Sequence, residues 1–135
     1  MIEFREYEDN DFEDVKNIIK EAFNIDVLNI DNDSNVYRLV SVKDEEVVGY
    51  LDITFSHDVI RNYKYAYINY VCVSSSSRGL GIGHKLVEKA IEICKERGVF
   101  SIRLTSNPKR CQARDIYLKL GFKIKDTDLF ERVIE

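Results

Sequence analysis

The chain has 135 residues, of which 44% are hydrophobic and 33% are charged. This composition is typical of one soluble globular domain, so we treat residues 1–135 as a single domain. It excludes wholesale disorder, collagen and coiled coil. The 20 basic and 24 acidic residues give a net charge of −4, which argues against a nucleic-acid partner. No stretch approaches the roughly 20 apolar residues of a membrane-spanning helix, so we expect no membrane partner.

The cysteines and the N-terminus indicate the compartment. The three cysteines are Cys72, Cys94 and Cys111, an odd number with no C-x-x-C pair. We therefore expect neither a disulfide framework nor a metal site. The segment Met1–Glu6 lacks a cationic stretch followed by an apolar core, so it does not resemble a signal peptide. These features predict a cytoplasmic location.

The hydrophobic pattern predicts alternating strands and helices. Residues Ile2–Tyr7 alternate as in a strand, and apolar residues from Phe12 to Phe23 recur at helical spacing. The acidic segment Asn24–Asn35 follows as a loop. Further helices are predicted from Ile82 to near Gly98 and at Arg110–Leu120. The other predicted strands are Val36–Val42, Glu46–Phe55, Tyr65–Val73, Val99–Thr105, Phe122–Lys125 and Leu129–Ile134.

Two details of this prediction concern the middle of the chain. The polar segment His57–Lys64 is predicted as a turn. The strand Tyr65–Val73 is almost continuously apolar towards its end, which predicts a central strand covered on both faces. The whole order predicts a mixed α/β fold with helices packed on one sheet.

A glycine-rich turn carries the chemistry. It reads Arg78-Gly79-Leu80-Gly81-Ile82-Gly83-His84, follows an apolar strand and opens a helix. The first N–H groups of a helix lack partners and attract anions, so this turn is suited to a phosphate group. Gly81 and Gly83 have no Cβ and let an anion approach the backbone, and Arg78 adds a charge. The spacing is neither that of a Walker loop nor that of a dinucleotide-binding turn.

Two motifs together resemble those of one family. The run Arg78–Gly83 matches the R/Q-x-x-G-x-G/A motif of the GNAT superfamily of N-acetyltransferases. The run Ala113–Phe122 resembles the A-x-x-x-Y-x-x-x-G-F signature of that family. The order of the elements fits over nearly the whole chain. The resemblance implies a mostly antiparallel sheet of six to seven strands, with a splayed parallel pair in its middle and about four helices.

The resemblance also implies where acetyl-CoA binds. It would lie between the strands Tyr65–Val73 and Val99–Thr105. In this arrangement the backbone pairs with the pantetheine arm and holds the pyrophosphate, and a small residue leaves room for the cofactor. The residues that would pair with the arm are Val71, Cys72 and Val73. Those that would hold the pyrophosphate are Arg78, Gly79, Leu80, Gly81, Ile82, Gly83 and His84. The small residue is Ala113. Either Ser106 or Asn107 would bond the pantetheine, and we favour Asn107; alternatively, both only form the turn before Pro108.

The family resemblance makes Tyr117 the general acid that protonates the departing CoA thiolate. Its phenol is protonated at neutral pH and can donate; alternatively, Tyr117 is only a packing aromatic. Many members have a Glu in the central strand as general base, where this chain has Asn69. Asn69 cannot take a proton but could hold a relaying water, and His57 and Asp52 are the nearby alternatives. The base stays open.

These observations favour one function over two others. The chain is expected to transfer an acetyl group from acetyl-CoA to a primary amine by direct attack in a ternary complex. The alternatives are a non-catalytic CoA-binding sensor or regulator, and an interaction domain without cofactor. The acceptor, a small-molecule amine or a peptide or protein amine, is not readable from the sequence. The resemblance allows a homodimer, and no metal is expected.

Overall fold

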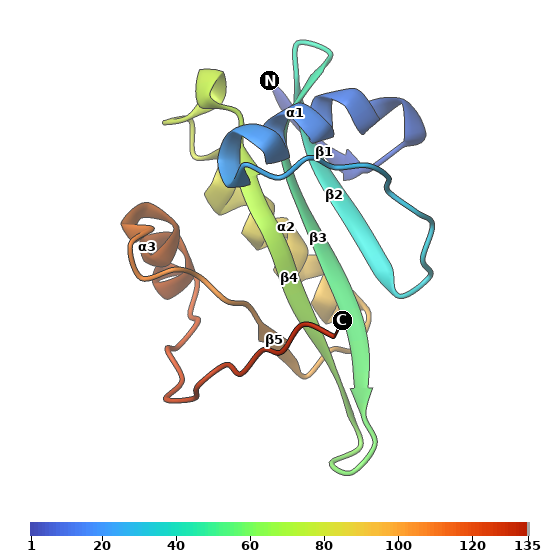
Figure 1. The fold of residues 1–135 in the computed structure, drawn as a ribbon, viewed down its shortest axis with the longest axis vertical. Helices are drawn as coiled ribbons and strands as arrows, with labels where there is room; N and C mark the ends of the chain where they lie inside the picture. Colours follow the sequence, from blue (N-terminus) through green and yellow to red (C-terminus); the bar gives the residue numbers. More distant parts are fainter. Residues whose placement is uncertain (135) are drawn as a thin grey trace.

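A single sheet lies between helices on its two faces (Figure 1). The computed structural model describes residues 1–134. In Figure 1, α1 lies in front of the sheet and α2 behind it. The helices are α1 (Phe12–Phe23), α2 (Ile82–Glu96) and α3 (Cys111–Lys119), with short 3-10 turns at Asp9–Asp11 and Ser75–Ser77. The strands are β1 (Ile2–Glu6), β2 (Val36–Lys43), β3 (Glu46–Asp58), β4 (Tyr63–Val73) and β5 (Ser101–Arg103).

The five strands follow one another across the sheet in chain order. Strands β1 to β4 are antiparallel to their neighbours, whereas β4 and β5 are parallel. The parallel pairing covers only Tyr65–Tyr67 of β4 and Ser101–Arg103 of β5. From residue 68 to residue 73 the edge of β4 that faces β5 has therefore no strand beside it. The expected splayed parallel pair is confirmed, but it lies at the edge of the described sheet and not in its middle.

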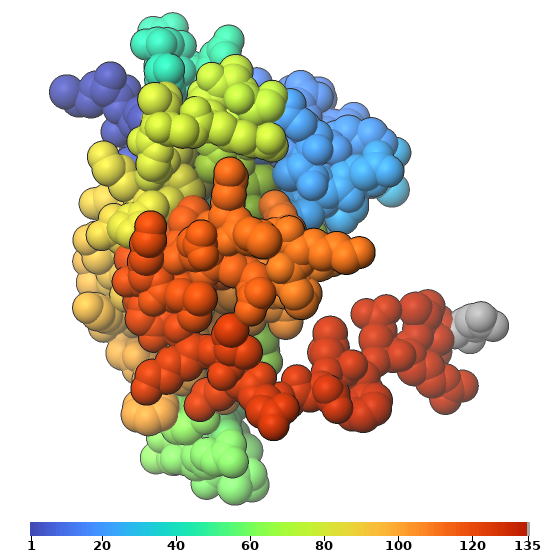
Figure 2. All heavy atoms as spheres, turned by 90° about the vertical axis from the view of Figure 1, so that its left-hand side faces the viewer, coloured from blue at the N-terminus to red at the C-terminus, as the bar shows by residue number. Residues whose placement is uncertain are grey.

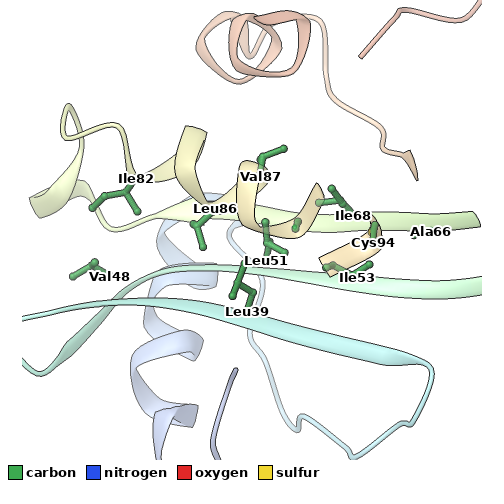
Figure 3. Packing of buried hydrophobic residues seen from close by; sticks show 11 residues of the cluster. Leu39, Val48, Leu51, Ile53, Ala66, Ile68, Ile82, Leu86, Val87 and Cys94 are labelled. Atoms are coloured by element: carbon green, nitrogen blue, oxygen red, sulfur yellow. The ribbon is translucent and has the colours of Figure 1, made fainter. Parts of the chain in front are cut away.

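The main core lies between α2 and the sheet. The buried residues of α2 recur at helical spacing and contact apolar side chains of β2, β3 and β4 (Figure 3). Each large aliphatic side chain buried in this way stabilises the fold by roughly 1.5–3 kcal/mol. The buried cluster consists of Leu39, Val48, Leu51, Ile53, Ala66, Ile68, Ile82, Leu86, Val87, Ala90 and Cys94.

Helix α2 approaches β3 most closely at Gly49. A Cβ at this position would lie 2.9 Å from Cδ1 of Leu86 and would overlap Oγ of Ser41. The close approach therefore requires glycine, because any side chain would push α2 away from the sheet. Ser41 itself is fully buried, and its hydroxyl finds no hydrogen-bond partner among the described residues.

The opposite face of the sheet is covered at one end only. Helix α1 buries Val15, Ile18 and Ile19 against this face. Its 12 residues span about 18 Å, whereas the 13 residues of β3 span about 43 Å. Beyond α1, Tyr67 is 37% exposed. The expectation that β4 is covered on both faces is therefore wrong for this half of the strand, because α1 is too short to reach it.

The predicted elements agree with the structure up to α3. The three helices and the first five strands are confirmed, but β3 continues to Asp58 and β4 begins at Tyr63. Half of His57–Lys64 is therefore strand, and the turn is limited to residues 59–62.

The expected strands Phe122–Lys125 and Leu129–Ile134 do not form in the described chain. Residues 123–134 are all exposed and extend away from the body (Figure 2). A strand needs a neighbour for its backbone groups, and here none is within reach. The described sheet thus has five strands, not six or seven, and three α-helices, not about four. None of these helices is long and apolar enough to cross a membrane.

Candidate active site

The free edge of β4 forms one side of the site. Here β4 is irregular, because Tyr70 has a φ of 56° and the β3–β4 pairing shifts register between Tyr50 and Asp52. Beyond this irregularity, β4 remains paired with β3 through Cys72 and Val73. The backbone groups that point to the other side of β4 are left without a strand partner. This edge can therefore accept an extended ligand in the way that a sheet edge accepts a strand.

The glycine-rich turn lies directly after this edge. Gly79 and Gly81 have φ values of 84° and 74°, which only glycine adopts readily. A Cβ at either position would meet nothing within 4 Å, so the surface of the turn is open. The first helical hydrogen bond of α2 runs from the Lys85 N–H to the Gly81 carbonyl at 3.2 Å. The N–H groups before Lys85 are free to bind an anion.

Gly83 brings three elements together. A Cβ there would lie 3.5 Å from Cδ1 of Ile116 on α3 and 3.8 Å from Cγ2 of Val73 on β4. The start of α2, the end of β4 and α3 therefore meet at one point. The imidazole of His84 is turned to the side, with Nδ1 2.9 Å from a carboxylate oxygen of Glu88. The His84 side chain is thus engaged with the next turn of its own helix.

Helix α1 is tied to this turn by Glu21. Its carboxylate accepts hydrogen bonds from the Ser75 N–H at 2.7 Å and the Ser75 hydroxyl at 2.8 Å. These two bonds hold the pKa of Glu21 below its usual value. In the sequence Glu21 resembles any solvated residue on the polar side of a helix, so no signal pointed to this contact across 54 positions.

A cleft of about 700 Å³ opens between the end of α1 and the loop from β5 to α3. Its volume is within the range of small-ligand sites. Arg110 and Phe23 belong to its lining, with the Arg110 guanidinium 4.8 Å from the centroid of the Phe23 ring. The Phe23 ring also packs edge-on against Tyr70, with ring centroids 5.5 Å apart. The cleft is lined by Glu21, Ala22, Phe23, Asn24, Thr105, Ser106, Asn107 and Arg110.

Ser106 and Asn107 both line the cleft. The side-chain oxygen of Asn107 accepts a hydrogen bond from the Lys109 N–H at 2.9 Å, and its carbonyl accepts one from Arg110 at 2.9 Å. Asn107 therefore forms the turn before α3, while its amide nitrogen is left for a ligand. The choice between the two residues as pantetheine partner stays a prediction.

Tyr117 lies one turn after Ala113 on α3, and both residues are half-buried. Its ring packs edge-on against Phe122 at 6.1 Å. Burial raises the pKa of Tyr117, and the Arg110 guanidinium partly opposes this shift. Burial also raises the pKa of the neighbouring Cys72 thiol to about 12, so Cys72 is neutral and not a nucleophile. Tyr117 is thus a protonated donor beside an uncharged thiol.

A polar cluster on the α1 face of the sheet runs from the buried Tyr50 to the half-buried Asp52 and Asn69. Asp52 accepts hydrogen bonds from the Tyr50 hydroxyl at 2.8 Å and from the Asn69 amide at 3.1 Å. The Asn69 amide also lies 3.3 Å from the hydroxyl of Thr54. Burial raises the pKa of Asp52, although both hydrogen bonds, and the charge of Arg38 on β2, oppose the shift. Asp52, a candidate for the general base, is therefore in direct contact with Asn69, the candidate for holding a relaying water.

The third residue, His57, lies elsewhere. It is exposed near the end of β3, with Nε2 3.3 Å from the side-chain oxygen of Asn62. It lies five positions along β3 from Asp52, which corresponds to about 17 Å.

The family follows from the whole sequence. A sequence model of the Acetyltransferase (GNAT) family matches residues 2–122. The chain belongs to this family. The streptothricin acetyltransferase of Escherichia coli is 31% identical over 100 residues, which are 74% of this chain and 53% of that protein. The GCN5-related N-acetyltransferase 6 of Arabidopsis thaliana, chloroplastic, is 34% identical over 68 residues, 50% of this chain and 24% of that protein. The chain thus spans about half or less of these relatives.

Solved structures agree with the GNAT fold. A transcriptional regulator from Bacillus halodurans C-125 has a TM-score of 0.89 and 29% identity, with 98% of this chain and 100% of that chain covered. The aminoglycoside acetyltransferase meta-AAC0020, from an uncultured soil metagenomic sample and in complex with sisomicin, has a TM-score of 0.85 at 18% identity. Its comparison covers 99% of this chain and 97% of that chain, and at this identity it shows the fold alone.

In this GNAT protein the predicted residues gather along one line. The line runs from the open turn at Gly81, along the free edge of β4, to Tyr117 on α3. Contacts from distant segments complete it, and the sequence did not indicate those made by Glu21, Phe23 and Arg110. Their residue types are common on helix surfaces, and only the packing of α1 beside the β5–α3 loop makes them neighbours.

Proposed function

We propose that this GNAT protein transfers the acetyl group of acetyl-CoA to a primary amine by direct attack in a ternary complex. The observation that carries the proposal is the continuous path from the open glycine turn, along the free edge of β4, to the Tyr117 phenol. Acetyl-CoA supplies the acyl group as an activated thioester. The protein contributes binding, orientation and proton transfer.

The residues along the path fit acetyl-CoA. Free N–H groups from Arg78 to His84 suit a pyrophosphate, and the glycines of the turn have no Cβ that would hold it off. The unpaired backbone groups of Val71, Cys72 and Val73 suit the amides of a pantetheine arm. Ala113 adds no bulk beside Tyr117, and Asn107 has a free amide nitrogen in the cleft.

Tyr117 is the proton donor in this proposal. The new C–N bond forms as the C–S bond breaks, and Tyr117 gives its proton to the departing sulfur. Because burial raises the pKa of Tyr117, the phenol stays protonated up to high pH. A backbone N–H near Val71 stabilises the oxygen charge that develops on the acetyl carbonyl.

We assign the role of proton acceptor to Asp52. Its raised pKa makes it a better base than an exposed carboxylate, and Asn69 holds it in place by a 3.1 Å hydrogen bond. Asn69 lies on β4, and α3, which carries Tyr117, meets β4 at Val73. In this proposal Asp52 takes the proton from the amine, and Tyr117 gives its proton to the sulfur.

The acceptor is proposed to bind on the open part of the sheet next to Asp52. Tyr67 lies there and is 37% exposed, and aromatic faces attract cationic amines, whereas the ring of the neighbouring Tyr65 already carries the Arg103 guanidinium at 4.3 Å. The name of one relative, a streptothricin acetyltransferase, supports amine antibiotics of that class as the first acceptors to test. Peptide and protein amines complete the panel.

A second function has an observation in its favour. Asn69 stands where many members of the family have a Glu, and the solved relative from Bacillus halodurans is described as a transcriptional regulator. The same cleft would then bind acetyl-CoA as a signal without turnover.

Thermal unfolding with acetyl-CoA, desulfo-CoA or adenosine diphosphate tests the cofactor site. A ligand at a hundredfold excess over its Kd stabilises the folded state by about 2.7 kcal/mol. A stability increase with acetyl-CoA, followed by release of CoA thiol with at least one amine, supports the transferase. An increase without release from any amine of the panel supports the regulator. No increase at saturating acetyl-CoA contradicts both functions.

A further inference from the structure

Arg103 on β5 places a positive charge on the face of the sheet where the acceptor is proposed to bind. In the register of the sheet Arg103 lies opposite Tyr67 of β4, and Tyr67 lies opposite Thr54 of β3. Residues paired across strands share a face. Thr54 in turn contacts Asn69, which holds Asp52 by a hydrogen bond of 3.1 Å. Arg103 and Asp52 therefore lie on the same face, beyond the part that α1 covers.

Tyrosines hold the Arg103 guanidinium but do not neutralise it. Its carbon Cζ lies 4.3 Å from the centroid of the Tyr65 ring, and Nη2 donates a hydrogen bond to the Tyr63 hydroxyl at 3.1 Å. The hydroxyls of Tyr63 and Tyr67 raise the pKa of Arg103, and no carboxylate of residues 1–134 contributes to this shift. A guanidinium has more N–H donors than these contacts use, so Arg103 can still bind a ligand.

The other charged side chains on this part of the face have partners of opposite charge. Asp52 lies opposite Arg38 of β2, and the positive charge of Arg38 acts on it. Asp58, at the end of β3, accepts hydrogen bonds from the backbone of the β3–β4 turn and pairs with the Arg61 guanidinium at 3.3 Å. The charge of Arg103 is thus the one left for an anionic ligand.

The separation between Asp52 and Arg103 restricts the shape of that ligand. The two residues are two strands apart and offset by two positions along the strands, so their Cα atoms lie about 12 Å apart. The guanidinium leans on Tyr65, away from Asp52 along β4. A hydrogen bond takes about 3 Å at each end, which leaves roughly 6 Å or more between the two polar groups of the ligand. An α-amino acid, whose amine and carboxylate share one carbon, is too short to reach both.

We propose that Arg103 binds a carboxylate of the acceptor, so that the acceptor is an amine with a carboxylate several bonds away from its nitrogen. The inference rests on the proposed function, because it places the reacting amine beside Asp52. The planar N–H donors of a guanidinium match the two oxygens of a carboxylate. The same charge disfavours an acceptor that is cationic along its whole length. An ω-amino acid has the required form, and so has a lysine-type side chain next to a free carboxylate.

Matched pairs of acceptors test the inference. The compounds δ-aminovalerate and ε-aminocaproate are each compared with their uncharged amide, and glycine with glycinamide is the short pair. Release of CoA thiol gives kcat and KM, and calorimetry in the presence of CoA gives the Kd of each acceptor without turnover. We expect the carboxylate to lower KM and Kd roughly tenfold in the two long pairs, as one charge-assisted interaction does. The glycine pair should show no such preference.

Variants of one side chain connect the preference to Arg103. In Arg103→Gln the long carboxylates should bind only as well as their amides, while kcat and the KM of the amides stay within about twofold of the wild type. Arg103→Lys should keep part of the preference, because the charge remains. The matched control is Arg97→Gln. The Arg97 guanidinium also lies over a ring, 4.5 Å from Phe55, but Phe55 packs against the core on the α2 side of the sheet, so this variant should keep the full preference.

The outcomes separate this inference from acetyl transfer. If amines are acetylated without a preference for the carboxylate, or if Arg103→Gln leaves the preference intact, Arg103 has no part in acceptor choice while the transferase stands. If the carboxylates bind better than the amides, and Arg103→Gln removes the difference without CoA release from any amine, the Arg103 site stands and acetyl transfer does not. Tighter binding of streptothricin-class polycations than of the ω-amino acids overturns the inference, and so does the absence of binding by all of these acceptors.

Discussion

Replacing Tyr117 by Phe removes one hydroxyl from the centre of the proposed reaction. The ring stays, and with it the edge-on packing against Phe122 at 6.1 Å. The hydroxyl makes no hydrogen bond within residues 1–134, and its pKa is raised chiefly by burial. Its loss therefore leaves no buried partner unsatisfied, and we expect the free energy of unfolding to change by less than about 0.5 kcal/mol.

The effect on the reaction should be much larger than the effect on folding. Proton transfer by a well-placed acid contributes about 10²- to 10⁴-fold to a rate. A loss of 10²-fold corresponds to about 2.7 kcal/mol of transition-state stabilisation. Because the bond to sulfur develops only as the thioester breaks, kcat should fall while the Kd for acetyl-CoA stays within about twofold.

The assay measures CoA thiol release by the wild type and Tyr117→Phe at several pH values, with acetyl-CoA affinity determined separately by calorimetry. The matched control is Tyr37→Phe. Tyr37 is also half-buried with a pKa raised mainly by burial, but it lies on β2 beside Arg97, away from the cleft. The control should keep full activity. If Tyr117→Phe retains the wild-type kcat throughout the pH range, Tyr117 is a packing residue and not the acid.

Three further changes have expected outcomes. Gly81→Ala and Gly98→Ala place a Cβ at φ values of 74° and 71° in open surroundings, so each should cost about 1–2 kcal/mol of stability by denaturant unfolding. Only Gly81→Ala should weaken acetyl-CoA binding, by roughly tenfold. If both variants bind acetyl-CoA with the same affinity, the turn is not part of the binding site. With Asp52 as base, kcat/KM rises with pH through a pKa above the usual carboxyl value; Asp52→Asn should abolish this rise and lower the plateau by about 10²-fold. An unchanged pH profile would exclude Asp52. Ser41→Ala removes a buried hydroxyl without a partner, so thermal unfolding should show equal or higher stability, and a clear loss would reveal a partner for that hydroxyl.

Local sequence determined the features that depend on neighbours in the chain. Helix α1 begins and ends where the apolar spacing predicts, at Phe12 and Phe23, because that spacing alone gives a helix one buried face. The turn before α2 is equally local. Gly79 and Gly81 adopt the positive φ values that a tight entry into the helix requires, so their positions in the sequence predict an anion-binding turn.

The tertiary structure decided which residues meet across strands and between layers. Asp52 contacts Asn69 because the β3–β4 turn occupies residues 59–62, and moving this turn by one residue would place the two side chains on opposite faces. The bond from Ser75 to Glu21 joins residues 54 positions apart, and it depends on how α1 crosses the sheet. The sequence patterns at Phe122–Lys125 and Leu129–Ile134 favour strands, but they specify no partner strand, and none forms. Helix periodicity and turn geometry involve a few adjacent residues, whereas strand pairing depends on segments that only the folded chain brings together.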